Sequence, residues 1–120
     1  METVWKMIFN ALQEAGIETY PPATKVGECL SEYVVVKKAG SSPVYRKSTE
    51  YVFYMFLLYV PRVKYSELDA FEKRVKHVLH EKLYPTLMPL GTEENDYYDD
   101  NYNAHMRSFT YRSNVRNKFI

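Results

Sequence analysis

Residues 51–60, YVFYMFLLYV, limit how this chain can fold more than any other stretch of its sequence. The ten residues are all apolar or aromatic, and Pro61 closes the run. A membrane-spanning helix needs about 20 such residues, so we expect a strand rather than a span. Because apolar side chains fall on both faces, the run predicts a central strand. It is covered either on each side by its own chain or on one side by a partner chain.

Two segments have the periodicity of amphipathic helices. The first has Thr3 as its N-cap and Gly16 at its C-terminal end, and its apolar stripe consists of Val4, Trp5, Ile8, Leu12 and Ala15. The second has Ser66 as its expected N-cap, Asp69 in a variant of the capping box, and Pro85 as its end. Its stripe consists of Leu68, Phe71, Val75, Val78, Leu79 and Leu83.

The remaining segments predict strands and turns. Residues 17–20 and 86–91 are expected to be short extended pieces, and residues 33–36 a strand that turns at 37–40. Residues 41–50 read as an exposed hairpin loop, and residues 102–115 as a closing strand with Met106 on one face and Phe109 and Tyr111 on the other. We therefore predict one domain, residues 1–120, of the α+β class: a mainly antiparallel sheet with two helices packed on one face.

The charge balance restricts the partners. Sixteen basic and 15 acidic residues leave a net charge of +1, which provides no overall field for nucleic acid or a membrane surface. The single cysteine, Cys29, fits a reducing cytoplasm, and we expect no signal peptide.

Metal or catalytic chemistry has weak support. His77 and His80 are three residues apart, but no third ligand follows by spacing, so we predict no metal and no cofactor. The acidic residues read as a solvated loop rather than a cation site: Glu93, Glu94, Asp96, Asp99 and Asp100. An enzyme using His77, His80 and His105 with this loop stays open as an alternative.

Residues 97–116 join an acidic aromatic loop to a basic aromatic strand. Such neighbours are self-complementary and suit contacts between identical subunits that close into a ring. The candidate interface residues are Asp99, Asp100, Arg107, Phe109, Tyr111, Arg112 and Arg116. The same basic and aromatic residues would also suit single-stranded nucleic acid, which is a second hypothesis.

Several short strings resemble a family of small structural proteins encoded between the head and tail genes of tailed bacteriophages and of prophages of Gram-positive bacteria. They are GEC at 27–29, YVP at 59–61, KYS at 64–66 with Leu68, YDD at 98–100, AHM at 104–106 and YR at 111–112. Within that lineage, the length and the element order are similar to tail terminator (tail completion) proteins. The resemblance covers roughly residues 10 to 115.

The resemblance implies a structural virion protein of the phage tail and neck, made in the host cytoplasm, with no catalytic residue and no cofactor. Tail terminators form a hexameric ring that caps the tail tube and joins it to the head connector. The implied partners are further copies of the chain, the tube protein, the connector or stopper and, in contractile tails, the sheath protein. DNA passes through the lumen as cargo. Another connector subunit, a stopper or adaptor, is the alternative within the lineage.

Overall fold

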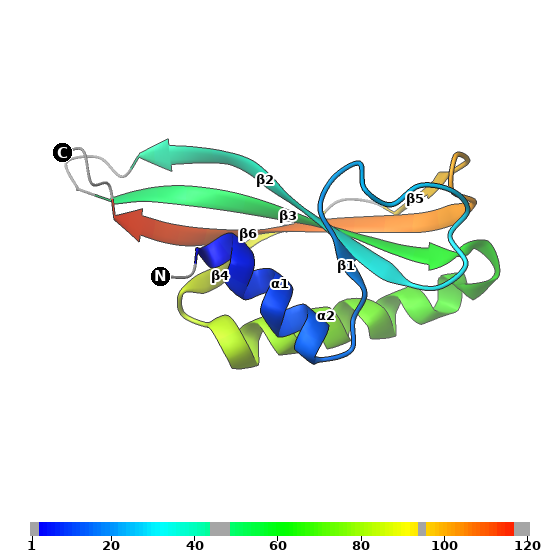
Figure 1. Cartoon of the computed structure of the whole chain (residues 1–120), viewed down its shortest axis with the longest axis horizontal. Coiled ribbons are helices and arrows are strands. Elements are labelled where there is room, and N and C mark those ends of the chain that lie inside the picture. Colours follow the sequence, from blue (N-terminus) through cyan, green and yellow to red (C-terminus); the bar gives the residue numbers. More distant parts are fainter. Residues whose placement is uncertain (1–2, 44–48, 94–95, 117–120) are drawn as a thin grey trace.

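The fold is a single sheet with both helices on one of its faces (Figure 1). A computed structural model describes residues 3–43, 49–93 and 96–116. The elements are α1 Val4–Glu14, β1 Thr19–Tyr20, β2 Tyr33–Pro43, β3 Thr49–Pro61, the 3-10 helix η1 Arg62–Glu67, α2 Leu68–Leu83, β4 Leu87–Glu93, β5 Tyr97–Asp99 and β6 Ala104–Arg116. The strand order is β1-β2-β3-β6-β4, and β5 also pairs with β6. All these pairs are antiparallel apart from β1 with β2, which confirms the predicted α+β class.

Helix α1 begins and ends as its sequence predicts. Thr3 accepts a hydrogen bond from the backbone N–H of Lys6, at 3.2 Å. At the other end Gly16 has a φ of 79°, and the N–H groups of Gly16 and Ile17 return to the carbonyls of Gln13 and Leu12. This is a Schellman motif, and it turns the chain toward β1.

Strand β3 is the centre of the sheet, between β2 and β6. Its side chains at positions 52, 54, 56, 58 and 60 are buried under the helices, and Phe56 and Leu58 have no exposed surface. The side chains at 51, 53, 55 and 57 point to the other face and stay partly exposed. The prediction of a central strand is therefore confirmed, and it has one covered and one partly open side.

Helix α2 buries the predicted stripe from Leu68 to Leu83 without exception. Its N-terminus differs from the prediction, because the helix begins at Leu68, and Ser66 lies inside η1. The backbone N–H of Leu68 bonds to the carbonyl of Tyr65, so the preceding 3-10 turn takes the place of a side-chain cap. Asp69 is used elsewhere, as described below.

Strand β2 is longer than predicted. It continues through the expected turn at 37–40 to Pro43, with a register shift between Lys38 and Gly40 that lets the strand bend. The central part of the expected 41–50 loop lies outside the described residues. In β6, Met106 and the pair Phe109 and Tyr111 lie on opposite faces, as predicted.

A second, smaller cluster lies on the face away from the helices. It consists of Cys29, Tyr33, Tyr59, Ala104 and Met106, and the rings of Tyr33 and Tyr59 stack at 4.9 Å. The loop at 21–32 closes over it, held by a 2.8 Å hydrogen bond from the Cys29 N–H to the Tyr102 carbonyl. This loop covers only one end of the face (Figure 1).

Candidate functional site

The uncovered part of the sheet face opposite the helices is the candidate site, and we call it the open face. Its residues come from four neighbouring strands, and each side chain is partly exposed. They are Val35 of β2, Tyr51, Phe53, Met55 and Leu57 of β3, Met88 of β4, and Thr110 and Arg112 of β6. Clusters of aromatic and aliphatic side chains that stay partly exposed to solvent are typical of surfaces that bind protein.

The two ends of this side of the sheet carry opposite charges. Toward one end, Arg112 lies over the Tyr51 ring at 4.5 Å, and the exposed Lys37 of β2 lies nearer the middle, opposite Met55. At the other end are Asp99 on β5 and Asp100 in the turn that follows. Asp99 pairs in register with Ala104, which is eight residues before Arg112 on β6. At about 3.4 Å per residue the two charges are about 27 Å apart, too far to pair within one chain.

Hydrogen bonds hold the acidic turn at residues 99–103 in a defined conformation. The Asp99 carboxylate accepts a hydrogen bond from the Asn101 N–H at 3.0 Å, and the Asp99 carbonyl accepts one from the Tyr102 N–H at 3.2 Å. Glu28, on the covering loop, accepts a hydrogen bond from the Asn103 amide at 3.1 Å. Glu28, Asp99 and Asp100 therefore stand together at this end. Glu93 belongs to β4, and Glu94 lies outside the described residues.

Arg107 lies on the helix side of the sheet and binds carboxylates of its own chain. Its guanidinium makes two hydrogen bonds to Asp96, at 2.6 and 2.7 Å, one to Glu72 at 2.9 Å and one to Asp69 at 2.5 Å. The side chains of Arg107, Glu72 and Asp96 are only 16%, 14% and 22% exposed, whereas Asp69 is 78% exposed and contributes less. We call these four residues the Arg107 network. It ties β6, α2 and the segment before β5 together, so Arg107 already has carboxylate partners within its own chain, and its predicted role in a subunit contact stays a prediction.

Acid should weaken the Arg107 network. The hydrogen bonds from Arg107 hold the pKa of Asp96 below its ordinary value of 3.8. A carboxyl whose pKa is lower in the folded state adds stability above 3.8, and that stability is lost as the pH falls through the folded pKa. We expect the urea midpoint of the wild type to fall more steeply between about pH 5 and about pH 2 than that of Asp96→Asn. Parallel curves for the two proteins would contradict this assignment.

Phe109 and Tyr111, which we predicted at a subunit interface, belong to the hydrophobic core. They are 2% and 5% exposed, and both rings pack on Phe56, with centroids 5.2 and 5.6 Å away. Burial removes them from any surface that the folded chain presents. It also removes the aromatic platform that the nucleic-acid hypothesis requires, because bases stack only on exposed rings.

The remaining candidates are distributed over the molecule. Asp99, Asp100 and Arg112 lie at the two ends of the sheet, as described above. Arg116 is the last residue of β6, opposite Thr49, and its side chain is outside the described part of the chain. Sequence reasoning left open that a partner chain covers one side of residues 51–60, but it named none of the open-face residues at positions 51, 53, 55 and 57 as interface candidates.

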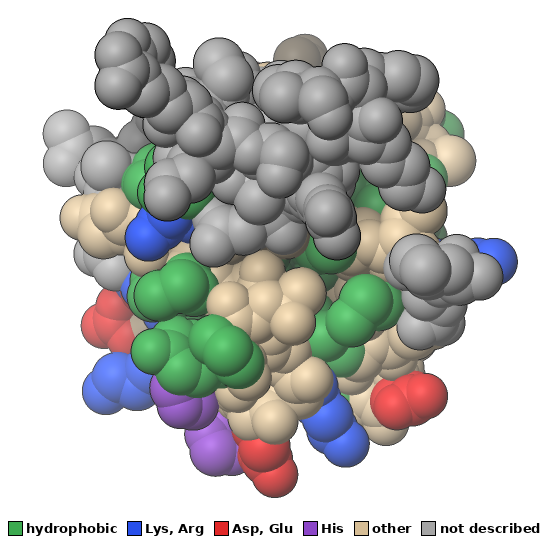
Figure 2. Space-filling view, turned by 90° about the vertical axis from the view of Figure 1, so that its left-hand side faces the viewer, with side chains coloured by type: hydrophobic (Ala, Val, Ile, Leu, Met, Phe, Trp, Pro, Cys, Tyr) green, Lys and Arg blue, Asp and Glu red, His purple; other side chains and the backbone are tan. Residues whose placement is uncertain are grey.

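The histidines do not converge. His77 pairs with Glu81 at 2.9 Å on the exposed side of α2, and His80 lies against the Tyr84 ring near the end of that helix. Figure 2 looks onto this end, where hydrophobic side chains lie beside histidine. His105 is on β6, with its Nε2 atom 3.1 Å from the carbonyl of Arg62. Among the residues described, no group of three or more His, Cys, Asp or Glu side chains is placed to hold a metal.

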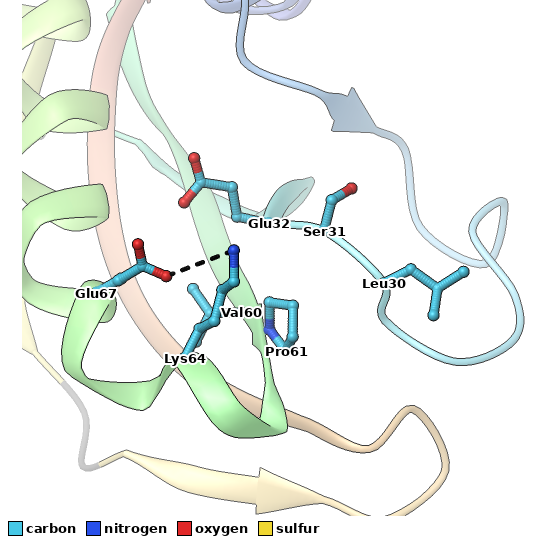
Figure 3. A pocket seen from close by; sticks show the side chains of 7 residues that line it. All are labelled: Leu30, Ser31, Glu32, Val60, Pro61, Lys64 and Glu67. Carbon is cyan, nitrogen blue, oxygen red and sulfur yellow. Dashed lines mark ion pairs between the residues drawn. The ribbon is translucent and has the colours of Figure 1, made fainter.

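A cleft of about 220 Å³ lies between the start of β2 and η1. Figure 3 shows Lys64 and Glu67, both of η1, close together on one side of the cleft, with 3.9 Å between their charged groups, and Leu30 on the segment that precedes β2. Glu32, on the segment that precedes β2, pairs with Arg74 of α2. The two carboxylates that line the cleft, Glu32 and Glu67, thus already have basic partners, so the cleft indicates no particular ligand.

Comparisons with known proteins leave the family open. No protein-family model matches this chain, and no curated protein matches it. In the described part of the chain, no helix is long and apolar enough to cross a membrane.

Proposed function

We propose that this chain is a structural subunit of the head–tail junction of a tailed bacteriophage, most like the tail terminator that caps the tail tube. The single observation that carries the proposal is the open face. A sheet with partly exposed Tyr51, Phe53, Met55 and Leu57 on its central strand is an incomplete core that a protein partner can complete. The resemblance of the sequence strings is the reason for proposing this lineage, and the open face is the reason for proposing assembly.

The fold suits an assembling subunit for a mechanical reason. Two helices pack on one face and stiffen the sheet, while the Arg107 network fixes the segment before β5 to α2. A rigid subunit loses little conformational freedom on assembly, so more of its contact energy remains as affinity. We expect the proposed ring to contain six copies of this subunit. One side of the ring would meet the tube protein, and the other would meet the connector. In a contractile tail the ring would also meet the sheath.

The lumen of such a ring would pass DNA without holding it. A surface of acidic side chains repels phosphates, and salt bridges such as that of Arg107 keep basic groups from binding them. The chain would be made in the host cytoplasm and would end in the virion, between tail and head.

Quantitative mass spectrometry of purified particles from a host that encodes the chain tests the proposal. We expect its peptides in intact virions and in isolated tails, at a copy number close to that of one ring and far below that of the tube protein. Particles that contain every other tail protein and no trace of this chain would contradict a structural role.

A further inference from the structure

We propose that in the free protein a second copy of this chain covers the open face, related by a two-fold axis that crosses the strands and sets the two sheets antiparallel. The inference rests on the proposed function only in treating the open face as an interface. It goes further in naming the occupant. Three features of that side of the sheet support this inference: the distribution of its charges, the difference in height between its two ends, and its size.

The charges on this side are self-complementary in one orientation. The basic end carries Arg112, with Lys37 between it and the middle of the sheet, opposite Met55, and the acidic end carries Glu28, Asp99 and Asp100. Lys25 also stands near the acidic end, over the rings of Tyr20 and Tyr33, but the acids outnumber it. A two-fold axis across the strands exchanges the two ends, so each basic end meets an acidic end. An axis along the strands would instead place like charges together.

The position of the axis follows from the register. Arg112 and Ala104, the register partner of Asp99, are equally far from Ser108 on β6, which pairs with Leu57 of β3. An axis at this level brings Arg112 of each copy over the Asp99 and Asp100 turn of the other. Leu57 and Val35, which pair in register on β3 and β2, then face their own counterparts at the centre. The contact would have an apolar middle and charged ends, as protein interfaces commonly do.

The difference in height between the two ends of this side fits the same arrangement. The loop at 21–32 adds a layer over the acidic end, and Figure 1 shows it on the side of the sheet opposite the helices. The described part of the basic end has no such layer. Over the described residues, this difference in height matches itself when the two ends are exchanged, because the raised end of each copy lies over the uncovered part of the other.

The size is sufficient for a weak dimer. Strand β3 has 13 residues, or about 43 Å, and four strands about 4.8 Å apart give a sheet roughly 800 Å² in projection. This is an upper value, since the covering loop occupies one end. Stable interfaces bury about 800 Å² on each partner. An interface at or below this size is expected to be weak enough for monomer and dimer to exchange.

Pairing of sheet edges between copies is a less favourable route. The outer edge of β2 beyond β1 carries Lys37, Lys38, a bulge and Pro43, and the edge strand β4 contains Pro89. Lysines, bulges and prolines are the devices that keep edge strands from pairing with one another. The open face is thus the better surface for a second copy. The two-fold pair is the form of the free subunit, and assembly into a ring would have to replace it.

Sedimentation equilibrium of the purified full chain, over a range of concentrations and at low and high salt, tests this inference. We expect a monomer–dimer equilibrium that weakens with salt, because the charge pairs at the two ends are partly exposed. Arg112→Glu and Asp100→Arg should each weaken the dimer about tenfold, since every pair occurs twice. The double variant should restore it to within about threefold of the wild type. Asp100 is preferred to Asp99 because Asp99 also holds the turn through Asn101.

Two further variants secure the interpretation. Lys73→Glu makes the same change of charge on the exposed side of α2 and should leave the dimer unchanged. Met55→Lys, a single change on the open face, should abolish the dimer while the circular dichroism spectrum stays that of the wild type. A wild type that stays monomeric at every soluble concentration would overturn the inference, as would a dimer that both single reversals leave intact. Absence of the chain from phage particles would refute the proposed function and leave this result standing.

Discussion

Phe109→Ala is expected to lower the free energy of unfolding by about 3–5 kcal/mol, the largest single loss that we predict for this chain. The ring is 2% exposed, stacks on Phe56 at 5.2 Å and lies beneath the ammonium group of Lys76, 4.8 Å from the ring centre. Truncation leaves a cavity that the surrounding strands and α2 can fill only in part. Urea denaturation, followed by circular dichroism and extrapolated to water, measures the loss.

Thr110→Ala is the matched control for this variant. Thr110 follows Phe109 directly on β6, but its side chain lies on the open face and is partly exposed, so we expect a loss below about 1 kcal/mol. A Phe109→Ala protein of wild-type stability that had lost only its self-association would show that Phe109 is an interface residue. Such a result would contradict its place in the core.

Arg107→Met should cost about 2–3 kcal/mol, somewhat less than the loss of a fully buried ion-pair partner. The change leaves Asp96 and Glu72, both mostly buried, facing each other and Asp69 without their shared cation. Lys76, whose ammonium group is 2.9 Å from the Glu72 carboxylate, then remains as a basic partner of Glu72. Thermal and urea unfolding at neutral pH measure the cost, and we expect it to shrink in acid, where the carboxyl groups become neutral.

Asp96→Asn in the Arg107→Met background separates lost pairing from lost packing. If the cost comes from uncompensated carboxylates, the second change removes one of them and should recover part of the stability. A double variant that is less stable than Arg107→Met by the full cost of Asp96→Asn alone would indicate no coupling between the two residues. The Arg107 network would then be a set of independent surface contacts.

Periodicity predicted the core of this fold well because it depends only on local order. The stripe of α2 follows from helical spacing, and the central place of β3 follows from an apolar run bounded by Pro61. The ends of elements were predicted less well. Ser66 has the composition of an N-cap, but the chain leaving β3 forms η1 first, and the carbonyl of Tyr65 supplies what a cap would have supplied. Strand β2 passes through a Lys-Lys-Ala-Gly segment that resembles a turn because pairing with β3 holds it extended.

The candidate site was predicted only in outline, because its residues were grouped by sequence and the sheet separates them by face. Residues 107, 109 and 111 point to the helices, whereas Arg112 points to the open face. The partners of Arg107 could not be read from the sequence, since Asp96, Glu72 and Asp69 are 11, 35 and 38 residues away. What could be inferred was that the central strand has apolar side chains on both faces, and that its own chain or a partner chain would cover them.

Electron microscopy of particles made by a phage or prophage from which this coding sequence has been deleted tests the central claim most directly. If the chain is the tail terminator, tube growth will lack its stop, so we expect tails of abnormal and variable length, with heads unattached. Expression of the wild-type chain in trans should restore tails of uniform length joined to heads. Tails of normal length that join heads in the absence of the chain would contradict the account.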